Sequence, residues 1–201
     1  MYPEFLYNIT FKENAYSTVL KPYIPYTAGD DEDRVTKRIC LCPTIEQCLS
    51  AIGPCSRDMH TGVHFVSRRV LVKDLNANSI YTPQYLSSSK RVPDAMATQE
   101  YWYCEEVTVV RKVYKILSFQ FERVINWACL TPQQVLNAAV KFVSANRLPA
   151  GASPLKVYMC ALAILESQEA YDEVDGLYDA IADLPWAQGV RFTDLEIEEV
   201  R

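Results

Sequence analysis

Several side chains that could bind a dinucleotide are spread over the first half of this 201-residue chain. Arg38 opens an apolar run, and an arginine can hold a pyrophosphate through parallel hydrogen bonds. An aromatic ring such as that of Tyr81 could stack on a nicotinamide. Glu100 could fix a ribose hydroxyl and stabilise the positive charge that develops as a glycosidic bond breaks. The candidate NAD site comprises one catalytic residue, Glu100, and the cofactor-binding residues Tyr7, Asn8, Thr10, Arg38, Tyr81 and Trp102.

Each candidate also has a simpler structural role open to it. An arginine in a buried strand must find an anion or another acceptor, because burying it unpaired costs several kcal/mol or more. Arg38 follows an acidic loop at residues 29–33 and could pair with it. The aromatic residues could belong to the core, and Glu100 could be a surface residue at the start of a strand. The sequence is compatible both with a dinucleotide-binding role and with a structural role for these residues.

Motifs of several common enzyme classes do not occur in the sequence. It contains no G-x-S-x-G, no P-loop pattern, no G-x-G-x-x-G and no H-E-x-x-H. The two histidines, His60 and His64, have no obvious partner and are predicted to be structural or solvent-facing. No two of the seven cysteines have C-x-x-C spacing. We therefore expect reduced cysteines in the core and no metal cofactor.

Apolar periodicity predicts a β-rich first part. Residues 5–11 alternate between apolar and polar, which is typical of a strand with one buried face. Thr44 is a good helix N-cap with Gln47 three residues later, and Gly53-Pro54 should end that helix. A short helical turn is expected within 14–20 and a flexible polar loop at 87–91. The expected strands are residues 5–11, 38–42, 63–72, 100–104 and 107–117.

The pattern becomes helical after about residue 121. Thr131-Pro132 followed by Gln134 is a strong helix start, and further helices are predicted from Ser153 and from about Gln168. The residues expected to face inward in these last two helices are Leu155, Tyr158, Met159, Leu162, Val174, Leu177, Tyr178 and Ile181. The predicted fold class is α+β: a mixed, mainly antiparallel β module over residues 1–120, followed by a small helical C-terminal module over 121–201.

Charge is distributed unevenly along the chain. The net charge is −5, and residues 150–201 carry 3 basic and 11 acidic side chains. Nucleic-acid binding through this end is not expected, because phosphate contacts need lysine and arginine. The acidic face could keep the protein soluble or dock a protein partner. No apolar run reaches the roughly 20 residues of a membrane span, and the N-terminus lacks signal-peptide features, so a cytosolic location is expected.

Several sequence blocks together resemble a family of small uncharacterised proteins from phages and Gram-positive bacteria. The blocks are Leu-Tyr-Asn-Ile-Thr at 6–10, Leu-Lys-Pro-Tyr-Ile-Pro at 20–25, the run at 38–49, Val-Pro-Asp at 92–94 and Glu-Tyr-Trp at 100–102. Their order is also similar to that of ADP-ribosyltransferase-like folds, which have a first strand with a ribose-binding histidine, an arginine-led strand with its helix, and a late strand with a glutamate.

This resemblance implies roles for individual residues. Asn8 would be the first motif residue, where many members have the histidine, and asparagine can still donate and accept hydrogen bonds. Arg38 would be a phosphate-binding or structural arginine, Tyr81 a stacking residue and Glu100 the catalytic glutamate. The implied activity is NAD-dependent transfer of ADP-ribose to a protein or nucleic acid in a bacterial host cytosol.

Two alternatives to catalysis are open. The first is a non-catalytic module that binds a nucleotide or a host defence protein. The second is an interaction protein that docks through its acidic C-terminal part.

Overall fold

The structure is a computed structural model that describes residues 2–11, 16–25, 32–52, 59–92, 94–184 and 187–200. The chain divides into two compact units. The first comprises Met1–Glu122 and Val190–Arg201, and the second comprises Arg123–Gly189. The fold is mixed α+β with antiparallel sheets, which confirms the predicted class at that level.

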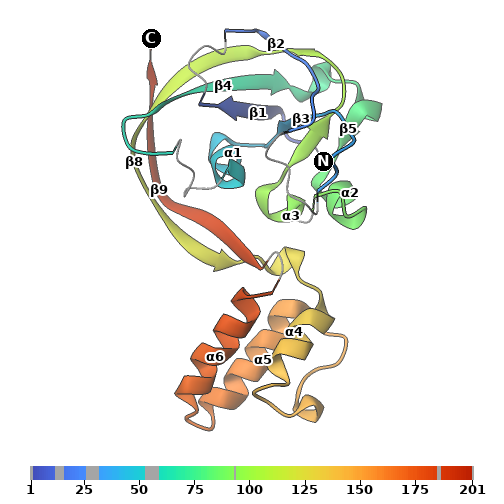
Figure 1. The fold of residues 1–201 in the computed structure, drawn as a ribbon, viewed down its shortest axis with the longest axis vertical. Helices are drawn as coiled ribbons and strands as arrows, with labels where there is room; N and C mark the ends of the chain where they lie inside the picture. Colours follow the sequence, from blue (N-terminus) through green and yellow to red (C-terminus); the bar gives the residue numbers. More distant parts are fainter. Residues whose placement is uncertain are drawn as a thin grey trace. The chain divides into compact units, whose positions relative to one another are not determined.

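The strands, drawn as arrows in Figure 1, are β1 (Phe5–Thr10), β2 (Val19–Leu20), β3 (Ile39–Leu41), β4 (His64–Leu71), β5 (Ile80–Tyr81), β6 (Tyr101–Tyr103), β7 (Val107–Thr108), β8 (Val110–Ile125) and β9 (Gln188–Val200). The α-helices are α1 (Ile45–Ile52), α2 (Pro83–Ser88), α3 (Ala95–Thr98), α4 (Pro132–Ala139), α5 (Pro154–Glu166) and α6 (Tyr171–Ala182).

Within the described residues, the strands of the first unit form three sheets. The largest has the strand order β1-β4-β8-β9, and its long strands β8 and β9 curl strongly in Figure 1. The second has the order β3-β6-β5, and β2 pairs with β7. A backbone bridge joins the first two sheets: Tyr7 N donates to Cys42 O at 2.8 Å, and Cys42 N donates to Tyr7 O at 2.9 Å. This bridge brings the strand that carries Asn8 close to the strand that follows Arg38.

Local signals explain the helix that follows β3. The backbone N–H of Gln47 donates to Thr44 Oγ1 at 3.1 Å, so Thr44 caps α1 as predicted. Cys48 and Leu49 are the buried residues of α1, and α1 lies beside β1. The predicted end of this helix at Gly53-Pro54 lies outside the described residues.

In the second unit, the described residues form helices α4, α5 and α6 around a core of their own. Helices α4, α5 and α6 pack on one another, as Figure 1 also shows. The Thr131 hydroxyl accepts from the Gln134 backbone N–H at 3.2 Å, and Gln134 Oε1 accepts from Thr131 N at 2.8 Å. This capping box at the start of α4 confirms the predicted helix start.

The buried face of α5 differs from the one that the sequence predicts. Leu155 and Met159 are 45% and 51% exposed, whereas Val157, Ala161 and Leu165 are buried. The segment Pro-Leu-Lys-Val-Tyr-Met-Cys-Ala-Leu-Ala-Ile-Leu-Glu is apolar on most sides, so periodicity alone does not determine which stripe faces the core. In α6 the expectation holds for Leu177 and Ile181, which are buried.

Three other expectations are corrected. Strand β8 runs to Ile125, so residues 121–125 are not helical, and residues 188–200 form β9 rather than part of a helical end. Val19 and Leu20 form β2 instead of a helical turn, while Asn14 and Ala15 lie outside the described residues. Ser87 and Ser88 belong to helix α2 rather than to a loop, because Thr82 and Pro83 start a helix there.

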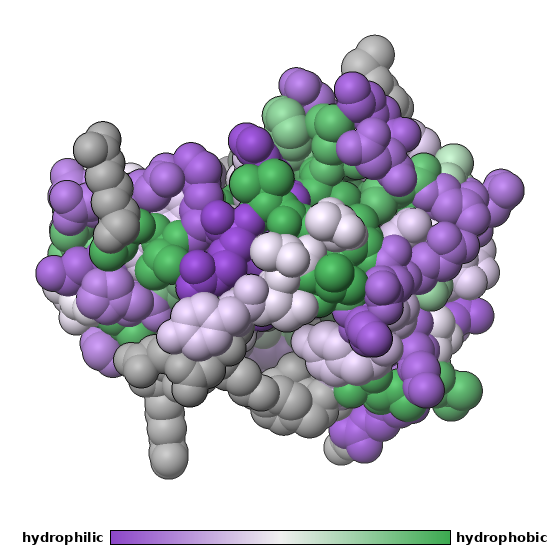
Figure 2. Space-filling model, turned by 90° about the horizontal axis from the view of Figure 1, so that it is seen from above, coloured by the Kyte–Doolittle hydropathy of each residue, from purple (hydrophilic) through white to green (hydrophobic). Residues whose placement is uncertain are grey.

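Figure 2 shows hydrophobic residues lying among hydrophilic ones on the face that it draws. Large exposed apolar side chains in the described residues include Val35, Tyr16 and Tyr171, at 86%, 70% and 67% exposure. No helix in the described part of the chain is long and apolar enough to cross a membrane.

Candidate functional site

Arg38 lies immediately before β3 and is only 1% exposed. Its guanidinium carbon is 3.9 Å from the centroid of the Trp102 ring. Nη2 donates to Glu32 Oε2 at 3.2 Å, and Nη1 donates to the carbonyl oxygens of Asp33 at 2.5 Å and Thr36 at 3.3 Å. The charge is therefore paired within the protein by the acidic loop that precedes β3, while the buried Nε has no hydrogen-bond partner among the described residues. Asp30 and Asp31 of that loop lie outside the described residues.

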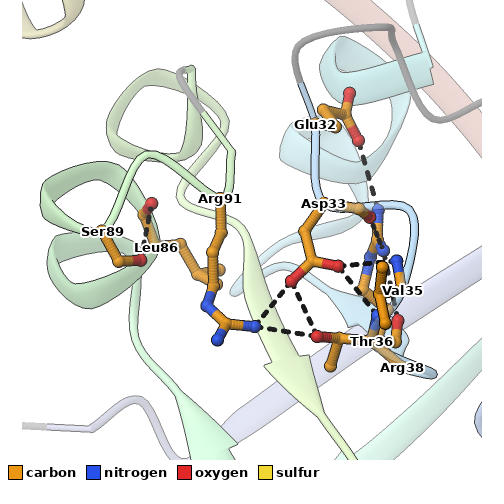
Figure 3. A network of polar contacts seen from close by, with 8 residues as sticks. All are labelled: Glu32, Asp33, Val35, Thr36, Arg38, Leu86, Ser89 and Arg91. Atoms are coloured by element: carbon orange, nitrogen blue, oxygen red, sulfur yellow. Dashed lines mark hydrogen bonds and ion pairs between the residues drawn. The ribbon is translucent and has the colours of Figure 1, made fainter.

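Asp33 ties this loop to a second arginine, as Figure 3 shows. Its carboxylate accepts from the backbone N–H groups of Val35 and Thr36, each at 2.8 Å, and from Arg91 Nη1 at 2.6 Å. Burial opposes ionisation of Asp33, but these hydrogen bonds and the charge of Arg91 outweigh it and lower the pKa to about 2. Asp33 thus contacts both arginines, through its carbonyl oxygen with Arg38 and through its carboxylate with Arg91.

Trp102 forms the centre of the cluster and is fully buried. Its indole Nε1 donates to Glu100 Oε1 at 2.6 Å, and Trp102 pairs across the sheet with Cys40 of β3. Burial raises the pKa of Glu100, hydrogen bonds from Cys40 and Trp102 oppose this, and the charges of Asp94 and Glu32 raise it further. Glu100 is therefore a largely buried carboxyl group whose ionisation is disfavoured.

Tyr81 belongs to the same cluster. Its ring centroid is 6.5 Å from that of Trp102 and 5.1 Å from that of Tyr85, and the Arg91 guanidinium carbon is 5.6 Å from its centroid. Four of the seven candidate residues thus come together around β3, β6 and β5: Arg38, Tyr81, Glu100 and Trp102.

Asn8 connects this cluster to the larger sheet. Its Nδ2 donates to the backbone carbonyl of Cys40 at 3.1 Å, and its Oδ1 accepts from Arg68 Nη1 at 3.2 Å. Tyr7 is its neighbour in β1 and so points to the other face of the sheet, where it packs against the cluster that contains Phe65. Thr10 pairs with Val66, two positions further along β1. The structure does not bring Tyr7 or Thr10 to the Trp102 ring.

Several polar residues of the site were not among the sequence candidates, including Glu32, Asp33, Cys40, Arg68 and Arg91. Glu32 lies in the acidic loop that the sequence indicates as a partner for Arg38, so its ion pair with Arg38 was predictable. Cys40, Arg68 and Arg91 reach the site through strand register and loop packing, which one sequence does not reveal.

A cavity of about 580 Å³ lies elsewhere in the first unit. Its lining includes Tyr2, Phe5, Leu71, Val72, Leu75 and Ile80, and none of the candidate residues. Within the described ranges, no group of three or more His, Cys, Asp or Glu residues is placed to hold a metal ion.

Comparison with known proteins found no matching family model, no similar curated protein and no similar solved structure.

Proposed function

We propose that the first unit is a nucleotide-binding module, similar in the order of its motifs to ADP-ribosyltransferase-like proteins, that holds its ligand without cleaving it. The supporting observation is the position of Asn8. This first-motif residue links the Cys40 carbonyl, and with it the Glu100 cluster, to the half-buried guanidinium of Arg68. Two hydrogen bonds of Asn8 thus connect the buried cluster to the positively charged Arg68 of the larger sheet, where a nucleotide would bind.

The chemistry of Arg38 and Glu100 favours binding over turnover. A transferase glutamate acts as a carboxylate on the ribose, whereas burial disfavours that form of Glu100. A pyrophosphate-binding arginine needs free N–H groups, whereas Arg38 donates to Glu32, Asp33 and Thr36. We interpret Arg38 and Glu100 as structural residues that stabilise the fold of the first unit.

The test is calorimetry of the full chain with NAD, ADP-ribose, ADP and GTP, combined with chromatographic measurement of nicotinamide release. We expect saturable binding of at least one nucleotide and no release of nicotinamide from NAD. Asn8→Ala should weaken binding by about tenfold or more, since it removes the amide that orients Arg68. Gln133→Ala, an exposed change on α4 in the second unit, should leave it unchanged. If no nucleotide binds, the proposal is wrong.

A second candidate is NAD-dependent ADP-ribosyl transfer in a bacterial host cytosol. The convergence of Glu100, Arg38, Tyr81 and Trp102 around one ring favours it. Nicotinamide release by the wild-type chain that is lost in Glu100→Gln would establish this candidate and overturn the non-catalytic proposal.

A further inference from the structure

The cavity of about 580 Å³ in the first unit shares no lining residue with the cluster around Trp102. It lies where β1 begins and β4 ends, at the cross-strand pair of Phe5 and Leu71. Leu75 and Ile80 also line it, and both are buried members of the core of this unit. Small-molecule sites are typically clefts of about 300–1,000 Å³ with mostly apolar linings. The cavity therefore has the size and the lining of a site for a small molecule with an apolar body.

Two aromatic rings belong to this lining, those of Tyr2 and Phe5. Tyr2 is 45% exposed, and its ring centroid is 6.4 Å from that of the buried Tyr101. The Arg69 guanidinium carbon is 4.6 Å from the centroid of the Phe5 ring. Aromatic groups pack favourably on such rings at centroid separations of about 4.5–7 Å. The lining thus favours an aromatic body for the ligand.

One positive and one negative side chain, those of Lys73 and Glu4, also line the cavity. Both side chains are exposed. The backbone N–H of Val72 donates to the carbonyl oxygen of Glu4 at 3.0 Å, so the backbone of Glu4 lies beside that of Val72 and Lys73. Neither Glu4 nor Lys73 forms an ion pair within the described ranges of the chain. A ligand in the cavity would therefore meet two opposite charges close together.

We propose that this cavity binds an aromatic amino acid, with its ring against Tyr2 and Phe5, its carboxylate at Lys73 and its ammonium group at Glu4. An amino acid carries both charges on one carbon atom, so it can pair with Lys73 and Glu4 at the same time. A ligand with a charge of one sign would bring that charge close to the like charge of one of them. The apolar lining provides the hydrophobic contribution to binding. The site shares no residue with the proposed nucleotide site, so the two proposals can fail separately.

The test is calorimetry of the full chain with L-tryptophan, tryptamine and indole-3-propionate, since the last two each lack one of its charges. We expect saturable binding of L-tryptophan and about threefold weaker binding of each analogue, which corresponds to one solvent-exposed ion pair. Lys73→Met should weaken L-tryptophan binding to the same extent without weakening that of tryptamine, which has no carboxylate. Glu4→Gln should weaken L-tryptophan binding without weakening that of indole-3-propionate, which has no ammonium group. Lys141→Met, at an exposed lysine of the second unit, is the matched control and should leave all three affinities unchanged.

A cavity-filling variant tests the location of the site. Ala77 lines the cavity and is exposed, so Ala77→Trp should fill part of the cavity without changing the core and weaken L-tryptophan binding by about tenfold or more. Thermal unfolding without ligand shows whether each variant is folded. If L-tryptophan does not bind, or if it binds to folded Ala77→Trp as tightly as to the wild type, the site is wrong. If both analogues bind as tightly as L-tryptophan, the proposed recognition of an amino acid by Lys73 and Glu4 is wrong.

Discussion

The guanidinium carbon of Arg38 lies 3.9 Å from the centroid of the Trp102 ring, and both side chains are almost completely buried. A cation on an aromatic face is worth about 2 kcal/mol or more when both groups are desolvated. Glu32 then neutralises the charge, and Glu100 accepts from the indole N–H. This pair connects the acidic loop, β3 and β6 in one contact.

We expect Arg38→Met to lower the free energy of unfolding by about 3–5 kcal/mol, since it leaves Glu32 without its partner and two carbonyl oxygens without donors. Arg38→Lys should also destabilise, by about 2 kcal/mol, because an ammonium group lacks the planar fork. The measurement is urea unfolding. Lys21→Met is the control: it removes the exposed ion pair with Glu106 and should cost less than about 0.5 kcal/mol. Equal losses for the two methionine variants would contradict the role of Arg38.

Asp33 should make stability depend on acid pH. Its pKa falls from 3.8 to about 2 in the folded state, so its contribution is complete above pH 4 and is lost as the pH falls through 2. Asp33→Asn should therefore lower the free energy of unfolding by about 1–2 kcal/mol at pH 6, with the difference disappearing near pH 2. Urea titrations at a series of pH values measure this. A difference that is constant with pH would show that the charge of Asp33 has no part in it.

Glu100 should show the opposite dependence. The pKa of Glu100 is raised in the folded state, so the protonated carboxyl group stabilises the fold. This stabilisation is fully present below the ordinary pKa of 4.5 and is lost as the pH rises through the folded-state pKa. Glutamine imitates the protonated acid and keeps an acceptor for Trp102. We expect Glu100→Gln to match the wild type near pH 4 and to gain relative stability as the pH rises toward 7.

Glu105→Gln is the matched control for this pH profile. Hydrogen bonds from Ser79 and Asn76 lower the pKa of Glu105, so its substitution should change the profile in the opposite direction. If both variants shift the profile in the same direction, burial does not govern the ionisation of Glu100.

The two sides of α5 should respond differently to truncation. Leu165 is 1% exposed and belongs to the core of the second unit, so Leu165→Ala should cost about 2–5 kcal/mol. Met159 is 51% exposed, and Met159→Ala should change stability by less than about 0.5 kcal/mol. Thermal unfolding of both variants provides the comparison. A larger loss for Met159→Ala would favour the face that periodicity first suggested.

Local signals made much of the fold predictable. The alternation in β1 and the threonine caps of α1 and α4 act within a few residues, so they can be read directly from the chain. The burial of α5 could not be read in this way, because apolar residues occupy most of its circumference and only packing against α4 and α6 selects one stripe. Strand β9 did carry a period-two signal, since Leu195 and Ile197 alternate with acidic residues and pack on the core beside Phe192, but the acidic content of this end drew the prediction toward a helical module.

The sequence by itself determined the residue types of the candidate site and the short-range elements that carry them. Arg38 before a strand, Glu100 and Trp102 at another, and Asn8 in the first strand are all visible in the chain. Only the tertiary structure decided that Arg38 lies on Trp102, that Glu100 is largely buried, and that Asn8, Arg68 and Arg111 form one row. The physical reason is register: a shift of one residue turns every side chain of a strand to the other face, and long-range pairing sets that register.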